Sequence, residues 1–268
     1  PSIYVKFPLE GREENLLIWT TTPWTLPANV AVMVHPREVY VRARTEDGDI
    51  LIIAEKRLEA VEKETGKKLE VLDRVMGMDL EGLVYRNPLE KFVPIQGEIV
   101  HQVVLSEEYV TMDEGTGLVH SAPGHGEEDF EVGLQYGLPM PSPVDDSGRF
   151  TSDAGKYAGM NVFEANKAII EDLEKLGVLF YAGEVVHKYP HCWRCKSKLI
   201  LRLSEQWFVK VSDLSEELVE EAMKTSWTPQ WALERRFKPW LSNAKDWAIS
   251  RQRYWGIPLS IWICEDGH

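Results

Sequence analysis

The sequence predicts an α+β fold in which short strands form a closed or nearly closed barrel with peripheral helices, followed by a smaller connector that is zinc-ribbon-like and helical. Three observations support this prediction. Short apolar runs are separated by turns rich in Gly and Pro through the first part of the chain. A long amphipathic pattern then covers 161–177. From Val185 to Ser204 the composition changes, and no acidic residue occurs.

The strands follow from apolar residues that alternate or form short continuous runs. The segment 2–8, for example, places Ile3, Val5 and Phe7 on one face. The Asp47-Gly48 pair favours a tight hairpin between two neighbouring strands. In chain order we expect strands at 2–8, 15–20, 38–44, 50–54, 68–75, 83–85, 91–95, 99–105 and 118–120.

The helices are predicted from apolar residues at helical spacing and from residues that begin or end a helix. Over 161–177, Ala165, Ile169 and Leu173 share one face, and Gly177 can end the helix in the left-handed conformation. The other expected helices are 55–65, one that begins near Glu127, 213–224, and 231–246 with an interruption around Pro239.

The change in composition divides the chain into a first domain, 1–183, and a connector, 184–268. With 268 residues and 44% hydrophobic content, the chain can bury a large core. Its formal net charge of −13 argues against non-specific binding of nucleic acid, which depends on neutralising phosphates. The connector still carries a basic run, which is either solvated charge or a phosphate-binding surface: Lys188, Arg194, Lys196, Lys198 and Arg202.

The apolar runs and the first residues of the chain indicate the compartment in which the protein is expected. No apolar run is long enough for a transmembrane helix, and the first residues lack the basic-then-apolar order of a signal peptide. We therefore expect a cytoplasmic protein without a membrane partner. The chain begins at Pro1 and ends within a pattern at 264–268, so we expect a piece of a longer protein.

The stretch 115–130 combines backbone freedom, titratable groups and a helix start. Its four glycines permit turns and a close approach of a ligand to the backbone. Pro123 should end the strand that carries His120, so that Asp129 falls in the first helical turn, where the macrodipole favours an ionised carboxylate. Such a carboxylate suits a cationic ligand. The simpler interpretation gives both titratable residues only a structural role.

A row of three β-branched hydroxyl residues, Thr20, Thr21 and Thr22, follows the second predicted strand. Pro23 holds this row extended, and the chain turns at Pro27. Stiff hydroxyl donors and acceptors suit a small polar ligand, because little entropy is lost when they are fixed. The alternative is the frayed end of a strand with its hydroxyls in water.

Cys192 and Cys195 have the two-residue spacing that lets two thiolates bind one Zn²⁺. A structural zinc site needs four ligands, and Cys264 is the third cysteine. Either His187 or His191 completes the site, or the missing pair lies outside this sequence, which is the interpretation that we favour. Two thiols without a metal are the alternative. Three cysteines cannot form a disulfide framework, so a reducing compartment is expected.

Four segments, in this order, resemble the isoleucyl-tRNA synthetases: WTTTPWTLPAN at 19–29, GTGLVHSAPGHGEEDF at 115–130, YPHCWRC at 189–195 and WAISRQRYWG at 247–256. The resemblance covers nearly the whole chain. It implies the editing insertion, also called connective polypeptide 1, followed by the connector that returns to the class I catalytic domain. Valyl and leucyl enzymes share this fold but carry an Arg in the threonine segment, whereas Thr22-Pro23-Trp24 matches the isoleucyl pattern.

The resemblance implies hydrolysis of valine that is mischarged onto isoleucine tRNA, with valyl-adenylate as a further candidate substrate. The resemblance implies that Asp129 anchors the ammonium group of the valine and that His120 leaves no room for isoleucine. It implies contacts to the aminoacyl group and the terminal adenosine for Thr20, Thr21 and Thr22. Trp24 is implied as a wall of the pocket, and Asn29 lies near the pocket without an assigned role. No cofactor is expected for editing, and the protein is expected to be a monomer.

Two further consequences follow from the resemblance. The ATP-handling signatures His-Ile-Gly-His and Lys-Met-Ser-Lys-Ser are absent, so ATP and Mg²⁺ are expected to serve only the full-length synthetase. Gln252, Arg253 and Trp255 resemble part of the synthetic domain. The alternatives are the editing domain of a valyl or leucyl enzyme, or a tRNA-binding zinc module without chemistry of its own.

Overall fold

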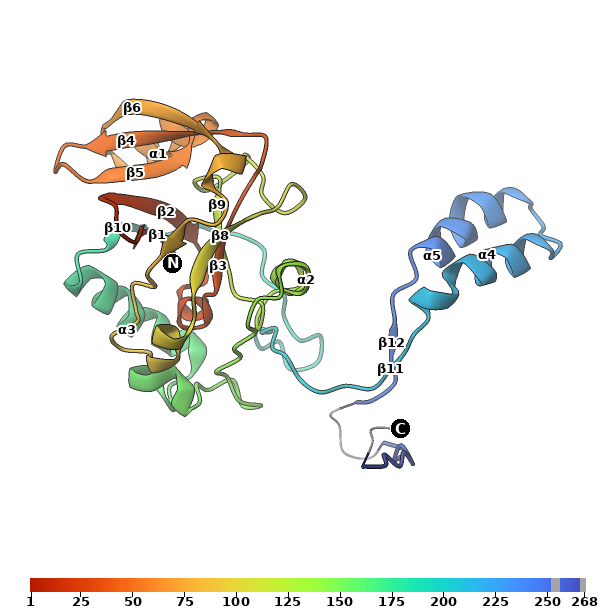
Figure 1. Cartoon of the computed structure of the whole chain (residues 1–268). Helices are drawn as coiled ribbons and strands as arrows, with labels where there is room; N and C mark the ends of the chain where they lie inside the picture. Colours follow the sequence, from red (N-terminus) through yellow and green to blue (C-terminus); the bar gives the residue numbers. More distant parts are fainter. Residues whose placement is uncertain (252–255, 266–268) are drawn as a thin grey trace. The chain divides into compact units, whose positions relative to one another are not determined.

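The structure, a computed structural model, describes residues 1–251 and 256–265 (Figure 1). The chain forms two compact units, Pro1–Leu203 and a second that begins at Ser204. The first unit extends past the predicted boundary at Gly183, because Leu203 N donates to Gly124 O (3.1 Å) and the His125 ring bonds to Leu201 O (2.9 Å). The division into an editing domain and a connector at Gly183 stays a prediction.

A six-stranded sheet forms one part of the first unit. Its strand order is β10-β1-β2-β5-β4-β6, and every pair is antiparallel except β2 with β5. The predicted hairpin joins β4 to β5, and Gly48 takes the positive φ of +94° that its turn requires. The strands are β1 (Ser2–Pro8), β2 (Glu14–Thr20), β4 (Val39–Thr45), β5 (Ile50–Ala54), β6 (Leu69–Met76) and β10 (Leu179–Gly183).

A four-stranded sheet with the order β7-β8-β3-β9 forms the other part. It contains β3 (Ala31–Val34), β7 (Val84–Tyr85), β8 (His101–Leu105) and β9 (Leu118–Ser121). The sequence did not predict β3, because four consecutive buried residues show no alternation. The strand predicted at 91–95 is wrong: a turn there leads into the 3₁₀ helix η4 (Pro94–Glu98), whose first residue is a proline.

The predicted barrel closure is also wrong, because the described strands of the first unit form two open sheets. Side chains of both sheets share one apolar core, with Val5 and Ile18 from the six-stranded sheet and Val32 and Val103 from the four-stranded sheet. The alternation of apolar residues shows which face of a strand is buried, but it does not show which strands pair at the edges.

Helices cover parts of these sheets (Figure 1). The predicted helix at 161–177 is confirmed as α3 (Val162–Lys175): the Asn161 side chain caps its first turn, and Gly177 follows its end with φ +70°. The helix predicted to begin near Glu127 is α2 (Glu127–Tyr136). The others are η1 (Pro23–Ala28), η2 (Glu55–Arg57), α1 (Leu58–Thr65), η3 (Gly77–Leu80) and η5 (Ser152–Tyr157).

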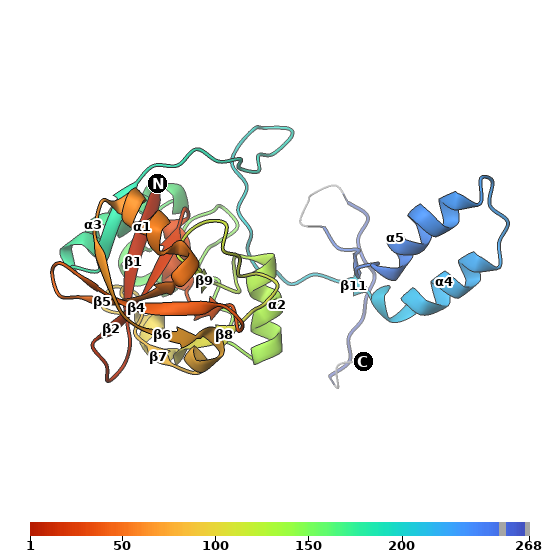
Figure 2. The same cartoon turned by 90° about the horizontal axis from the view of Figure 1, so that it is seen from above.

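The second unit is a pair of helices beside a short two-stranded ladder (Figure 2). Its small core comprises Ala222, Leu233 and Leu241. The predicted interruption around Pro239 is not a break: helical residues run from Trp231 to Ser242, the π-type segment ends at Phe237, and Pro239 lies in the first turn of α5. The elements are β11 (Phe208–Val209), η6 (Ser212–Leu214), α4 (Ser215–Met223), the π-type helix η7 (Leu233–Phe237), α5 (Lys238–Ser242) and β12 (Trp247–Ala248).

Gln252, Arg253 and Trp255 lie outside the described residues. Over 1–251 and 256–265, no helix has both the length and the apolar character that a membrane span requires.

The turn before β9 depends on Gly117, which has φ +75°. A Cβ atom at this position would lie 2.4 Å from Cβ of Ala54 and 3.1 Å from Sδ of Met112. We expect Gly117→Ala to lower the free energy of unfolding by roughly 2–4 kcal/mol, from backbone strain and overpacking together. Urea unfolding measures this loss.

Gly66 is the matched control, because its φ is +70° but nothing lies within 4 Å of its added Cβ. Gly66→Ala should lose only the backbone part, about 1 kcal/mol. Equal losses in the two variants would contradict a packing role for Gly117.

Candidate functional site

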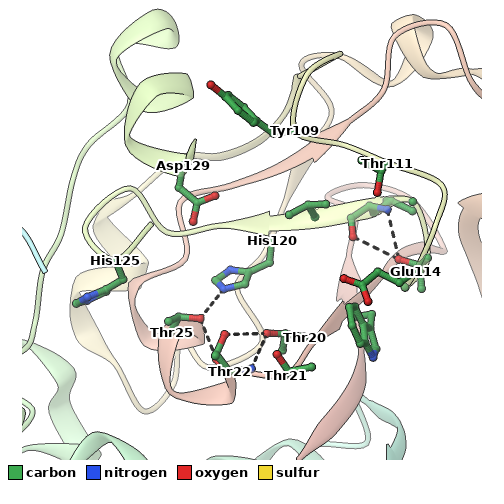
Figure 3. A pocket seen from close by; sticks show the side chains of 16 residues that line it. Thr20, Thr21, Thr22, Thr25, Tyr109, Thr111, Glu114, His120, His125 and Asp129 are labelled. Atoms are coloured by element: carbon green, nitrogen blue, oxygen red, sulfur yellow. Dashed lines mark hydrogen bonds between the residues drawn. The ribbon is translucent and has the colours of Figure 1, made fainter. Parts of the chain in front are cut away.

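A pocket of about 350 Å³ opens where the end of β2, strand β9, the start of α2 and the loop 109–117 meet (Figure 3). Five residues predicted from the sequence line it: Thr20, Thr21, Thr22, His120 and Asp129. Segments nearly a hundred residues apart in the chain are therefore brought to one cavity. Pro123 acts as predicted, because β9 ends at Ser121 and α2 begins at Glu127.

Hydrogen bonds within the threonine row set its shape. The backbone N–H of Thr22 donates to Oγ1 of Thr20 (3.1 Å), and the two hydroxyls lie 3.3 Å apart. The chain then turns into η1, where the backbone N–H of Thr25 donates to the carbonyl of Thr22 (3.0 Å). The hydroxyl of Thr20 is thus held in place by the backbone of the same row.

His120 is a buried, neutral side chain at the pocket wall. Its Nδ1 lies 3.1 Å from Nδ2 of Asn29, and its Nε2 lies 2.7 Å from Oγ1 of Thr25. Burial lowers the pKa of His120 to about 4, and His125 nearby acts in the same direction. Both ring nitrogens are engaged with protein groups, so His120 is suited to shaping the pocket and not to transferring protons.

Asp129 points into the pocket from the first turn of α2. Its Oδ2 accepts a hydrogen bond from the backbone N–H of Ala122 (3.0 Å). Burial raises the pKa of Asp129 to about 6, and the Ala122 bond opposes this shift. The sequence interpretation considered only the start of the helix and its dipole and expected a carboxylate that stays ionised. In the folded chain the carboxylate is mostly ionised at pH 7, but it is poorly solvated.

The charges around the pocket are unbalanced. Glu114 and Asp129 line it, and the described residues that line it include no Lys or Arg. No described cation lies within ion-pair distance of Asp129. A desolvated carboxylate without a counter-charge favours a cationic ligand.

Two residues predicted for the site do not line this pocket. Trp24 is buried and lines an adjoining pocket, which shares Thr21 and Thr22 with the first. Its backbone N–H donates to Oδ1 of Asn166 in α3 (2.9 Å). Asn29 is fully buried behind His120. Its side chain therefore cannot touch a ligand in the pocket and can affect one only through the imidazole of His120.

The structure adds residues that the sequence interpretation missed: Thr25, Tyr109, Thr111, Glu114 and His125 also line the pocket. Thr25 and His125 lie inside the two segments that pointed to the site, but no pattern in those segments distinguished them from their neighbours. Tyr109, Thr111 and Glu114 lie in a loop that matches no motif. In Figure 3 the ring of His125 is turned away from the threonine row.

The Cys192–Cys195 segment forms a tight turn. The backbone N–H of Lys196 donates to the Cys192 carbonyl (2.9 Å), and that of Cys192 donates to the Ser197 carbonyl (2.8 Å). The Ser197 hydroxyl lies 2.9 Å from Sγ of Cys195 and lowers the pKa of that thiol to about 7. Two neighbouring thiols, of which Cys195 has the lowered pKa, fit half of a zinc site.

The rest of a zinc site is not assembled in the part of the chain that the structure describes, where no three His, Cys, Asp or Glu side chains cluster. His187 and His191 each direct Nδ1 to a nearby backbone carbonyl. Cys264 belongs to the second unit.

Comparison with known proteins bears on both units. The family model for class I tRNA synthetases (I, L, M and V) matches residues 12–268. The isoleucine–tRNA ligase of Methanothermobacter thermautotrophicus is 53% identical over 266 residues, and that of Archaeoglobus fulgidus is 52% identical over 270 residues. Each match covers 99% of this chain but only 25% and 26% of those proteins, so the chain spans about a quarter of their length.

Solved structures match the fold. The GlLeuRS-CP1 structure aligns with a TM-score of 0.52 at 17% identity, covering 71% of this chain and 100% of that one. The editing domain of the P. knowlesi cytosolic leucyl-tRNA synthetase aligns with a TM-score of 0.51 at 12% identity, covering 66% and 94%. The mixed α+β fold is thus that of a synthetase editing domain. By the family model and these relatives, the chain belongs to the class I tRNA synthetases of the isoleucine, leucine, methionine and valine group.

Proposed function

We propose that this chain is the editing part of an isoleucine–tRNA ligase and hydrolyses the ester that joins valine to isoleucine tRNA. One observation carries the proposal: an unpaired, desolvated carboxylate, Asp129, shares a small pocket with an immobilised neutral imidazole, His120. The likeness to isoleucine–tRNA ligases supports the choice of amino acid and tRNA.

The α-ammonium group is the cation that such an ester presents. In an aminoacyl ester the carboxyl group is consumed, so the amino acid carries a positive charge without its negative partner. Asp129 offers Oδ1 toward this ammonium while Oδ2 accepts from Ala122. Binding of the ammonium would also offset the free-energy cost of desolvating the carboxylate, since an opposite charge stabilises the ionised form of the carboxylate.

His120 would limit the size of the aliphatic side chain. The synthetic pocket of isoleucine-specific synthetases has a known limit: one methylene contributes only about 1–3 kcal/mol of discrimination against valine. A second site that admits valine and excludes isoleucine supplies the remaining accuracy. A buried ring with both nitrogens bonded can act as a rigid wall.

Hydrolysis would proceed by positioning a water molecule at the ester carbonyl. The described residues that line the pocket include no Ser or Cys nucleophile, and His120 is held neutral with both nitrogens engaged. The hydroxyls of Thr20, Thr21 and Thr22 can orient the water and the terminal ribose, and their dipoles can stabilise the developing oxyanion. A hydroxyl of the substrate's ribose can assist the proton transfer.

The test is hydrolysis of valyl-tRNA and isoleucyl-tRNA, both on isoleucine tRNA, by the purified chain. We expect the valyl ester to be hydrolysed well above its spontaneous rate and the isoleucyl ester to remain near that rate. Valyl ester that disappears no faster than in buffer would contradict the proposal.

A second candidate is a tRNA-binding module without chemistry. The observation in its favour is the basic run of the first unit, where Arg194 lies within the Cys192–Cys195 turn and Lys196 directly follows it. We propose that these two cysteines hold a structural zinc whose other ligands lie outside this chain. Unchanged tRNA affinity after replacement of the threonine row, with no hydrolysis by the parent, would favour the binding module.

A further inference from the structure

A series of buried hydrogen bonds connects the four-stranded sheet to the threonine row. The hydroxyl of Tyr85, on β7, donates to Oδ1 of Asn29 (2.8 Å), and Nδ2 of Asn29 lies 3.1 Å from Nδ1 of His120. Nε2 of His120 lies 2.7 Å from Oγ1 of Thr25, which donates to the carbonyl of Thr22 (2.9 Å). Figure 3 shows the last part of this series.

The donor and the acceptor of every hydrogen bond in this series follow from the neighbouring groups. Nδ2 of Asn29 also faces two carbonyls, those of Ala31 (2.9 Å) and Ser121 (3.3 Å), so this atom is the amide nitrogen. It must therefore donate to Nδ1 of His120, which leaves the imidazole proton on Nε2. That proton goes to Oγ1 of Thr25.

Tyr85 is the only partner of Oδ1 of Asn29 among the described residues. Burial raises the pKa of Tyr85 well above its usual value, so its hydroxyl remains a donor at all working pH values. The ring is held in turn by edge contact with His101 and a tilted contact with Phe7, each with centroids 5.4 Å apart. The phenol is thus a rigid donor behind the amide.

We infer that Tyr85, which does not line the pocket, is a positioning residue that acts through Asn29 to hold the ring of His120 in one orientation. The inference rests on the proposed function for its consequence, which is discrimination between aliphatic side chains. Without the phenolic donor, Oδ1 of Asn29 is a buried acceptor without a partner among the described residues. The carbonyls of Ala31 and Ser121 still hold the amide nitrogen toward His120, so the tautomer is kept, but the amide and the imidazole that it supports are less firmly fixed.

The test compares Tyr85→Phe with the parent chain by ¹⁵N NMR of the histidine side chains. In the parent we expect His120 to show protonated Nε2 and unprotonated Nδ1. In Tyr85→Phe we expect the same tautomer with shifted and broadened ring resonances of His120, and the ratio of valyl to isoleucyl ester hydrolysis should fall roughly three- to tenfold, as for loss of one buried hydrogen bond. Tyr157→Phe is the matched control, because Tyr157 is equally buried and its hydroxyl bonds to Asp172 (2.9 Å) away from the pocket.

A double-variant cycle tests whether Tyr85 acts through Asn29. In an Asn29→Ala background, Tyr85→Phe should change neither the His120 resonances nor the ratio further. Unchanged His120 ring resonances with an unchanged ratio in Tyr85→Phe, or an equal effect of Tyr157→Phe, would overturn the inference. Because the NMR readout needs no activity, a parent that hydrolyses neither ester would overturn the proposed function while the His120 ring resonances still decide the role of Tyr85.

Discussion

Replacing Asp129 with Asn is expected to remove most hydrolysis of the valyl ester. The amide keeps an oxygen for the backbone N–H of Ala122, so the local geometry survives while the charge disappears. Loss of one hydrogen bond between charged groups should lower kcat/KM by roughly 10- to 200-fold, equivalent to about 1.5–3 kcal/mol. In the parent, kcat/KM should fall as the pH drops through about 6, where Asp129 takes up a proton.

The same substitution should make the chain more stable at neutral pH. The pKa of Asp129 is about 6 in the folded chain, against about 3.9 for an unfolded aspartate, so the folded state disfavours the charge. This cost is absent below pH 4, grows between pH 4 and pH 6, and is complete above pH 6. Asp129→Asn should therefore raise the free energy of unfolding by roughly 1–3 kcal/mol at pH 7.5 and leave it unchanged below pH 4.

Urea unfolding at pH 3.8 and pH 7.5 measures this difference. Asp145→Asn is a control of opposite sign, because backbone and side-chain hydrogen bonds from Arg149 and Ser147 lower the pKa of Asp145. Its carboxylate contributes stability above the unfolded pKa that is lost as the pH falls, so this variant should be less stable at pH 7.5. An Asp129→Asn variant that retains hydrolysis, or one that is destabilised at pH 7.5, would show that Asp129 does not serve as a desolvated ammonium anchor.

Replacing His120 with Ala is expected to open the pocket to isoleucine. The ring is buried against Asn29 and Thr25, and its removal leaves space beside the proposed position of the valine side chain. Discrimination that depends on one methylene amounts to roughly 10- to 200-fold, so hydrolysis of the isoleucyl ester should rise relative to the valyl ester by a factor in this range. Deacylation of both esters measures the ratio.

Phe150→Ala is the matched control for His120→Ala. Phe150 also carries a buried ring, which packs in the apolar core shared by the two sheets and does not line the pocket. This variant should lose stability and keep the preference for valine. If His120→Ala still excluded the isoleucyl ester, the steric role of His120 would have to be abandoned.

Local sequence features determined much of this protein. Asn161 and Gly177 bound α3, Pro123 ended β9 before α2, and the Asp47-Gly48 pair set the β4–β5 hairpin. Each depends on backbone preferences within a few residues, which the sequence shows directly. The motifs around Thr20, His120 and Asp129 likewise identified the family and most of one pocket.

Only the tertiary structure decided the rest. It showed two open sheets instead of a barrel, with the unpredicted β3 inside the smaller sheet. It showed that Asn29 lies behind His120 and bonds to Tyr85, and that burial raises the pKa of Asp129. Strand pairing, desolvation and hydrogen-bond partners depend on residues far apart in the chain, and no local pattern of apolar or polar residues records those neighbours.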